Sequence, residues 1–283
     1  APIDLELTQN SGQTSQPPWK LDNNIYSDVV VADNKAVLFQ VKQKENNLDF
    51  NFIGDISNKE ATKKIKTIFD LDFNLNKFYK YLNNQPELAD MTNFCRDLRL
   101  FLAKDKFECV ISSVCSANNS IVRWTKSIDD IKKSWGNKYT YSEKDYFTFP
   151  DVSDFKNIYC DDVEEFECCS NLNNPGECIN NLKSCGVGYR APYMKKASEI
   201  FTLEMDLDDI SKMSYDEAFD TMLKVPGVGP KVADCILLYG FNFRQAFPTD
   251  VWIKRIVSYL YFDGKDINVS KIREFGMEEF GDY

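Results

Sequence analysis

Apolar and polar residues alternate along three short stretches in the first part of the chain. The stretches are residues 25–31, 36–42 and 48–53. In the last of them the alternation places Leu48, Phe50 and Phe52 on one face. A period of two is typical of half-buried strands. The polar tetrapeptides ADNK and KENN between the stretches suit hairpin turns, so the pattern predicts an antiparallel sheet near the N-terminus.

The spacing of apolar residues becomes helical from Lys59 onward. The clearest predicted helix ends at Gly136. Its inward face is expected to carry Ile121, Trp124, Ile128, Ile131 and Trp135. Because strands come first and helices follow, the predicted fold class is α+β, with an N-terminal antiparallel sheet domain over residues 1–85, including flanking helices, and a helical region over 86–283.

Residues 136–181 lack a helical period and contain the acidic, cysteine-bearing run CDDVEEFECCSNLNNPGEC. We interpret this segment as a loop, with an acidic insertion at about 155–180.

The segment LKVPGVGPKVADC, which begins at Leu223, predicts a helix, a tight hairpin and a second helix. The first helix, from Asp216 to Leu223, is expected to turn Ala218, Met222 and Leu223 inward and to end at Pro226-Gly227. The second is expected to run from Pro230 to Tyr239, with Gly240 as its C-terminal stop.

Gly227 and Gly229 permit backbone conformations that other residues avoid. Glycines also let backbone amides and the positive end of a helix approach an anion, such as a phosphate of a nucleic-acid backbone. An ordinary interhelical turn is the alternative reading. Amide contacts need no surplus of cations, which matters because the net charge of the chain is −10.

The chain contains no histidine, so catalysis must rest on Lys, Asp, Glu, Cys or Tyr. Lys231 lies in the first turn of the second helix, where the helix dipole disfavours positive charge by about 0.3–1 kcal/mol. An uncharged lysine is a nucleophile toward a carbon such as C1′ of a sugar. Cys235 follows on the same helical face. Thr249 or Asp250 opens a later helix, and Asp250 is interpreted either as its N-cap or as a carboxylate that stabilises charge on the sugar.

The nine cysteines form an odd count without a CxxC pair, which favours reduced thiols in a cytosolic or nuclear protein. The spacing of Cys160, Cys168, Cys169 and Cys178 fits no common zinc site, so we expect no metal centre there. The longest apolar runs are too short to span a bilayer, and no signal peptide is evident.

The segment LKVPGVGPKVADCILLYGFNFRQAFPTDVW resembles the helix-hairpin-helix-GPD signature of DNA glycosylases, and specifically the 8-oxoguanine DNA glycosylase family. The resemblance implies helix-hairpin-helix glycosylase domains after the sheet and a bifunctional DNA glycosylase and AP lyase. It also implies Lys231 as the Schiff-base nucleophile, Asp250 as the carboxylate that aids base departure, and Cys235 as a wall of the base pocket. Trp252 stands where many family members carry a histidine near the phosphate of the flipped nucleotide.

Three further segments resemble the same family. In CSANNSIVR, the resemblance implies that Asn118 fills the gap left by the extruded nucleotide and that Arg123 contacts the orphaned base. In GVGYRAPY it implies that Tyr189 is a wedge and that Arg190 points toward the partner base. In LELTQNSGQT it implies that the Gly12 carbonyl accepts the N7 proton of 8-oxoguanine, which guanine lacks.

The partner implied by the resemblance is double-stranded DNA containing oxidised guanine, bound by a monomer without a membrane. No cofactor is expected, apart from a monovalent cation that hairpin carbonyls could bind. The compartment would be the cytoplasm in a prokaryote and the nucleus in a eukaryote.

Two alternatives remain. A relative that removes another base with an iron–sulfur cluster needs four cysteines after the hairpin, and only Cys235 lies beyond Gly229. A non-catalytic DNA-binding scaffold would use the hairpin alone, and the combination of Lys231 with Asp250 argues against it.

Overall fold

The computed structural model describes residues 1–12, 14–32, 34–160 and 180–281. The predicted N-terminal sheet is confirmed, and its antiparallel strands lie in the order β1-β2-β3-β4. The strands are β1 (Lys20–Asp22), β2 (Ile25–Ala32), β3 (Lys35–Lys44) and β4 (Asn47–Ile53). Asn34 and Glu45 adopt positive φ angles of 60° and 54° in the two tight turns around β3. The β1 strand was not predicted, because three exposed residues show no alternation.

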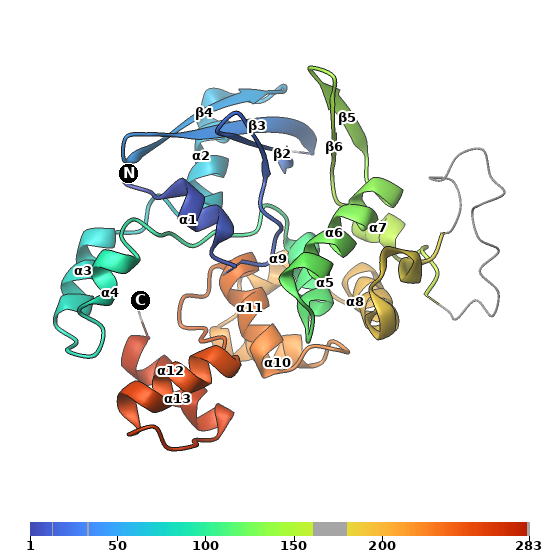
Figure 1. Ribbon diagram of the computed structural model, residues 1–283. Coiled ribbons are helices and arrows are strands. Elements are labelled where there is room, and N and C mark those ends of the chain that lie inside the picture. The colour runs from blue at the N-terminus through green and yellow to red at the C-terminus, as the bar shows by residue number, and fades with distance from the viewer. Residues whose placement is uncertain (13, 33, 161–179, 282–283) are drawn as a thin grey trace.

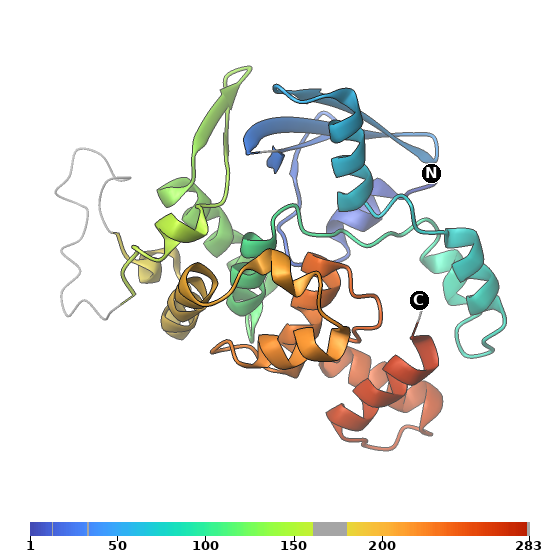
Figure 2. The same cartoon turned by 180° about the vertical axis from the view of Figure 1, so that it is seen from behind.

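One face of the sheet packs against α1 (Leu5–Asn10) and α2 (Asn58–Ile68), and α2 crosses the sheet in the view from behind (Figure 2). The β3–β4 register pairs Phe39 with Phe52 and Val41 with Phe50. Burial in β4 alternates along the strand, as predicted, with the more buried face toward this core. Trp19 packs its ring edge against Phe69 and closes one side of the core.

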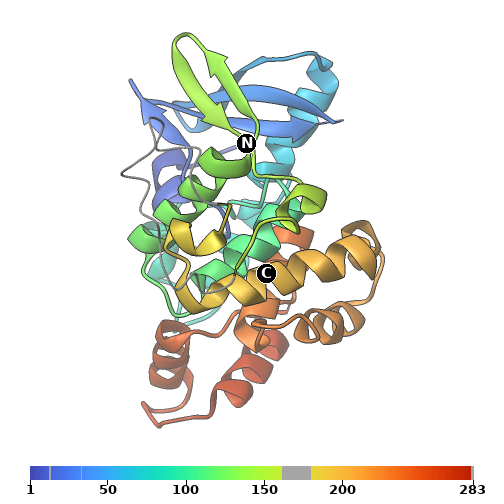
Figure 3. The same cartoon turned by 90° about the vertical axis from the view of Figure 1, so that its right-hand side faces the viewer.

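A second, smaller hairpin lies beside the sheet (Figures 1 and 3). It consists of β5 (Lys138–Tyr141) and β6 (Lys144–Phe147) and is followed by α7 (Val152–Phe155). The prediction of a loop from residue 136 is therefore wrong for this part, because four-residue strands rich in Lys, Tyr and Asp carry too little pattern. Tyr146 packs with Val29 and Leu38 on the second face of the sheet. Most of the acidic insertion predicted at about 155–180 lies outside the described residues.

Helices fill the rest of the structure, below the sheet in Figure 1. They are α3 (Leu75–Asn83), α4 (Met91–Phe94), α5 (Lys106–Ser116), α6 (Ile121–Trp135), η2 (Leu182–Cys185), η3 (Gly188–Arg190), α8 (Ala191–Leu203), α9 (Leu207–Ile210), α10 (Tyr215–Leu223), α11 (Pro230–Phe241), α12 (Val251–Tyr261) and α13 (Val269–Phe280). The largest apolar core gathers around α5, α6, α8, α10 and α11. Within the described residues, no helix is both long and apolar enough to cross a bilayer.

The α6 helix spans the predicted residues and ends at Gly136, where the Thr148 carbonyl approaches too closely for a side chain. Trp124, Ile128 and Ile131 are buried as predicted, whereas Ile121 is 62% exposed. Ile121 is the first residue of the helix. The spacing of apolar residues therefore predicts a buried face that is longer than the face the core actually covers.

Two buried ion pairs lie where the sheet meets the helices. Lys104, before α5, pairs with Asp28 of β2 and also donates to the Val29 carbonyl at 3.1 Å. Lys132 of α6 pairs with Glu108 of α5 at 2.7 Å. Because an unpaired buried charge is costly, these contacts tie β2, α5 and α6 into one arrangement. The boundary between residues 85 and 86 stays a prediction.

Candidate active site and DNA-binding surface

The predicted helix, hairpin and second helix are present as α10, residues 224–229 and α11. Ala218 and Met222 are fully buried, but Leu223 is 38% exposed, so its predicted inward position is wrong at the frayed end of α10. The second helix extends past Gly240 and ends at Asn242, which has the left-handed conformation that closes a helix. Gly240 is needed for packing instead, because a Cβ there would lie 2.8 Å from Cys109 Sγ.

Only one of the two hairpin glycines requires a left-handed backbone. Gly227 has a φ angle of 83°, and a Cβ there would lie 2.8 Å from Tyr193 Cβ. Gly229 has a φ angle of −94° and caps α11 in an extended conformation, so the conformational argument is wrong for it. Among the described residues, no atom beyond its two chain neighbours lies within 4 Å of the position of its missing Cβ. The absence of a side chain there leaves the N-terminal amides of α11 open to an anion.

Lys231 and Cys235 lie together on α11, as their spacing predicts. Burial raises the pKa of the Cys235 thiol. The charge of the Lys231 ammonium and a hydrogen bond from it both lower that pKa. The Asp250 carboxylate also acts on Cys235 and adds to the increase. The three side chains predicted from distant parts of the motif are therefore close enough to interact.

Asp250 is the N-cap of α12, which the sequence left as one of two interpretations. Its Oδ1 accepts hydrogen bonds from the amides of Trp252 at 2.9 Å and Ile253 at 2.8 Å. Its Oδ2 accepts no hydrogen bond from the described residues. One oxygen therefore fixes the start of the helix, and the other accepts no hydrogen bond within the described part of the chain.

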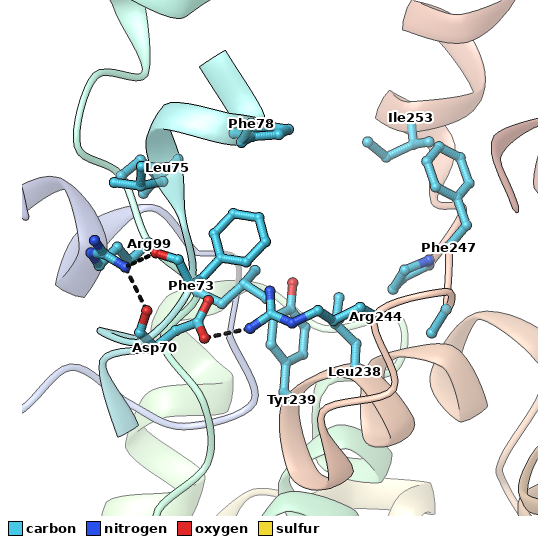
Figure 4. A pocket seen from close by; sticks show the side chains of 14 residues that line it. Asp70, Phe73, Leu75, Phe78, Arg99, Leu238, Tyr239, Arg244, Phe247 and Ile253 are labelled. Atoms are coloured by element: carbon cyan, nitrogen blue, oxygen red, sulfur yellow. Dashed lines mark hydrogen bonds and ion pairs between the residues drawn. The ribbon is translucent and has the colours of Figure 1, made fainter. Parts of the chain in front are cut away.

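A cavity of about 320 Å³ lies further along the same face of α11 (Figure 4). Tyr239, two helical turns beyond Lys231, forms part of its wall, and Ile253 of α12 forms another. Phe73 and Phe78 line the opposite side and come from the segment that follows the sheet. The cavity is mainly apolar, in a size range that small ligands use. Its lining does not include Gly12, Cys235 or Trp252.

Three charged residues in this cavity were not predicted. Arg244 pairs with Asp70, and its guanidinium lies 4.4 Å from the centre of the Phe73 ring. Arg99 donates to the carbonyl oxygens of Asp70 and Phe73. Burial raises the pKa of Asp70, and Arg244 opposes that increase. The only sequence signal was a charge inside an apolar run, as Arg99 is in LRLFL.

Asn118 and Arg190, predicted from separate segments, lie together. Arg190 is only 7% exposed, and its Nε and Nη2 each donate to a carbonyl at 2.7 Å, those of Ala117 and Asn118. In this structure the guanidinium is therefore beneath the Asn118 loop, and the contact with a partner base stays a prediction. Asn118 itself is exposed, with a φ angle of 50°. A positively charged side chain that binds two successive carbonyls holds this loop in place.

The other predicted DNA-contacting side chains are on the surface. Arg123 lies exposed in the first turn of α6. Tyr189 is 58% exposed and meets Tyr193 edge to face at 6.4 Å between ring centres. Since Tyr193 also packs against Gly227, the GVGYRAPY segment and the hairpin form one continuous surface.

Gly12 and Trp252 lie at two different places. Gly12 has a φ angle of 73° and lies against Ile121, where an added Cβ would be 3.3 Å from Cδ1. The segment after Gly12 is anchored by Ser15, whose hydroxyl donates to Cys109 Sγ at 3.0 Å. Trp252 is 66% exposed on α12, with the Arg255 guanidinium 5.1 Å from the centre of its ring.

The fold and this site define a class of protein. A family model described as HhH-GPD superfamily base excision DNA repair protein matches residues 111–281, and one described as 8-oxoguanine DNA glycosylase, N-terminal domain, matches residues 1–110. The chain therefore belongs to the helix-hairpin-helix-GPD superfamily and, within it, to the 8-oxoguanine DNA glycosylase family.

Individual relatives agree with this assignment. The chain is 42% identical over 281 residues to a Methanothermobacter thermautotrophicus protein named "Probable N-glycosylase/DNA lyase", covering 99% of this chain and 89% of that one. The Clostridium acetobutylicum 8-oxoguanine glycosylase/lyase, solved with double-stranded DNA containing cytosine opposite 8-oxoguanine, superimposes with a TM-score of 0.79 at 28% identity. That match covers 99% of this chain and 87% of the other.

A third structure shares the fold alone. The 3-methyladenine DNA glycosylase of Archaeoglobus fulgidus superimposes with a TM-score of 0.78 at 18% identity, covering 99% of this chain and 91% of that one.

Proposed function

We propose that this protein excises 8-oxoguanine from double-stranded DNA and then cleaves the strand at the resulting site, as a bifunctional N-glycosylase and DNA lyase. The observation that supports the proposal is that Lys231, in the first turn of α11, and Asp250, the N-cap of α12, both act on the Cys235 thiol, which puts the three side chains in one region. A nucleophile, a carboxylate and two helix N-termini lie there within reach of one substrate.

The base must leave the stack before the lysine can reach C1′, and unstacking costs a few kcal/mol. Asn118, on the loop that Arg190 holds, and Tyr189 are suited to occupy the gap and to limit that cost. The exposed position of Arg123 suits a contact with the orphaned base.

In the chemical step, Lys231 gives up a proton to water and its amine attacks C1′ while the bond from C1′ to the base breaks. The base leaves with the bonding electrons and takes up a proton from water. The free Oδ2 of Asp250 is placed to stabilise positive charge that develops on the sugar. Loss of a proton from nitrogen and opening of the sugar ring give an imine, and β-elimination from that imine breaks the 3′ phosphate bond.

Discrimination against guanine is proposed to rest on the Gly12 carbonyl, which would accept the N7 proton of the lesion. Guanine presents a lone pair at N7 and would leave the carbonyl unpaired, at a cost of about 1–3 kcal/mol. Cys235 is proposed to pack against the base on the α11 side.

The hairpin is also proposed to bind a monovalent cation through backbone carbonyls. The carbonyl oxygens of Pro226, Gly227 and Val228 accept no hydrogen bond from the described residues, which leaves them available as ligands. If the proposal is correct, replacing potassium by a bulky organic cation at constant ionic strength weakens duplex binding.

Borohydride trapping on a duplex with 8-oxoguanine opposite cytosine tests the function. The wild-type protein should form a covalent adduct and Lys231→Gln should form none, while Lys63→Gln, an exposed lysine of α2, serves as a matched control. Undiminished trapping by Lys231→Gln would remove the lysine assignment. The same duplexes carrying other damaged bases distinguish this activity from a glycosylase of another preference.

A further inference from the structure

The lysines of this acidic protein are widely neutralised by neighbouring carboxylates. Surface pairs with N–O distances of 2.5–2.9 Å occur on the sheet, the helices and the small hairpin. Examples are Lys35–Asp55, Lys66–Asp72, Lys133–Asp129 and Lys144–Asp22. A cation that already has a carboxylate partner attracts a phosphate less, so the unpaired cations decide where a polyanion binds.

Near the candidate active site, three exposed cations differ from this pattern. Arg123, Lys224 and Arg255 have no carboxylate within 4.0 Å among the residues that the structure describes. Arg123 has a role already implied by the sequence, but Lys224 and Arg255 have none.

The positions of these two residues connect them to the hairpin. Lys224 is the C-cap of α10 and the first residue of the hairpin, and Lys231 lies just beyond the hairpin in the first turn of α11. Arg255 lies in the second turn of α12, whose capping residue Asp250 interacts with Cys235. Both cations therefore extend outward from the segments that hold the reactive groups.

Arg255 is also partly ordered by its neighbour. Trp252 lies one turn before it on the exposed face of α12, and the Arg255 guanidinium is 5.1 Å from the centre of the indole ring. A guanidinium on the face of an aromatic ring keeps its outward donors free. The indole N–H offers one more donor on the same surface.

We propose that Lys224 and Arg255 each bind a backbone phosphate of duplex DNA, with Trp252 positioning Arg255. This inference rests on the proposed function, because that function places DNA across the hairpin. It adds two contacts to the surface made by the hairpin amides and Arg123, in a protein whose remaining charge repels DNA.

The inference has a quantitative consequence for the salt dependence of binding. Each neutralised phosphate contributes about −0.9 to the slope of log affinity against log salt concentration. A slope of about 0.9 corresponds to about eight-fold in Kd between 0.1 M and 1 M salt. Removing either cation should therefore weaken binding by about eight-fold at 0.1 M salt and very little near 1 M.

The experiment measures the Kd of an undamaged duplex by fluorescence anisotropy across salt concentrations. The variants are Lys224→Gln, Arg255→Gln, the double variant, and Lys63→Gln as the control for loss of one exposed positive charge. Each of the first two should lose about 0.9 from the slope, and the double variant about 1.8. Lys63→Gln, on the helix that covers the sheet (Figure 2), should keep the wild-type slope.

Two further variants test the positioning by Trp252. Trp252→Phe should retain most of the contribution of Arg255 to duplex affinity, since a ring remains. Trp252→Ala should weaken duplex binding more when Arg255 is present than when it is replaced in Arg255→Gln. Equal losses in both backgrounds would refute the positioning role.

Wild-type slopes for Lys224→Gln and Arg255→Gln, or a loss equal to that of Lys63→Gln, would overturn the phosphate-binding proposal. Borohydride trapping on lesion DNA by the same preparations reports separately on the proposed function. A protein that shows the slope changes without trapping would retain these phosphate contacts and lose the glycosylase assignment.

Discussion

Replacement of Arg273 by leucine provides a test of what holds the catalytic helix. Arg273 of α13 donates to both oxygens of Asp234, through Nε at 2.6 Å and Nη2 at 3.1 Å. Asp234 lies on α11 three residues after Lys231. The Tyr215 hydroxyl of α10 joins Arg273 and Asp234, so the cluster links three helices.

The expected cost follows from burial. The Asp234 side chain is fully buried and that of Arg273 is 16% exposed, so Arg273→Leu would leave an anion in the core without its partner. Breaking a buried pair in this way costs about 3–5 kcal/mol, against about 0–1 kcal/mol for an exposed pair. The Arg273 guanidinium also lies 4.1 Å from the centre of the Phe219 ring. Since the variant loses this contact too, its loss in the free energy of unfolding should lie toward the upper end of that range.

The measurement is urea denaturation at neutral pH, with the midpoint compared at an unchanged m value. We expect Arg273→Leu to lower the free energy of unfolding by about 3–5 kcal/mol. Lys265→Gln is a matched control, because Lys265 pairs with Asp263 in the loop before α13 and both side chains are more than two-thirds exposed, at 71% and 88%. Its expected change is below about 1 kcal/mol.

A double variant distinguishes loss of a partner from loss of packing. Asp234→Leu combined with Arg273→Leu removes both charges, and a buried pair replaced by apolar residues is often neutral in stability. We therefore expect the double variant to recover most of the loss. A change below about 1 kcal/mol for Arg273→Leu, or a double variant as unstable as the sum of the two single changes, would refute the reasoning.

Three further predictions concern the cap, the packing of α11 and the buried thiols. Asp250→Asn should slow single-turnover excision by about 10²–10³-fold, because the carboxylate charge is lost. It should change the free energy of unfolding by less than about 1 kcal/mol, because asparagine retains a capping oxygen. A rate loss no larger than the loss of folded protein would make Asp250 a cap only. Gly240→Ala should cost about 1–3 kcal/mol, because its Cβ would lie 2.8 Å from Cys109 Sγ, and an unchanged denaturation midpoint would contradict that packing. Burial raises the pKa of Cys109 to about 12 and the pKa values of Cys115 and Cys185 to about 11. Since these thiols ionise first in the unfolded chain, the melting temperature should fall as pH rises above the ordinary thiol pKa of 9.0. A melting temperature that stays constant between pH 9 and pH 11 would contradict this assignment.

The sequence predicts the elements best where a long pattern and a buried face coincide. The three longer strands of the sheet and α6 have the predicted order and nearly the predicted bounds. The errors lie at element ends and in short pieces. Leu223 and Ile121 follow the helical spacing but lie at helix ends that the core covers only in part. Gly240 is typical of a stop, although α5 approaches it closely enough to require glycine.

The candidate site shows a similar division. The spacing of Lys231 and Cys235 indicates that they share a helical face, whereas the expected position of Asp250 near them rested on the resemblance to the family signature. The contact of Arg190 with the Asn118 segment was not predicted, because it depends on how η3 packs under that loop. The cavity residues Asp70 and Arg244 are 174 positions apart, and no local pattern relates them.

The distribution of ion pairs explains how a chain of net charge −10 can bind DNA. Inside the protein, Arg190, Arg273 and Lys104 bind carbonyls or buried carboxylates, which fixes loops and helices relative to one another. Outside, many lysines are neutralised by carboxylates, so they neither attract nor orient a duplex. Lys224 and Arg255 remain unpaired among the described residues around the hairpin, so cations that can attract a phosphate are present on the surface that the active site opens onto. Repulsion elsewhere then disfavours other orientations of the duplex and so contributes to positioning the lesion.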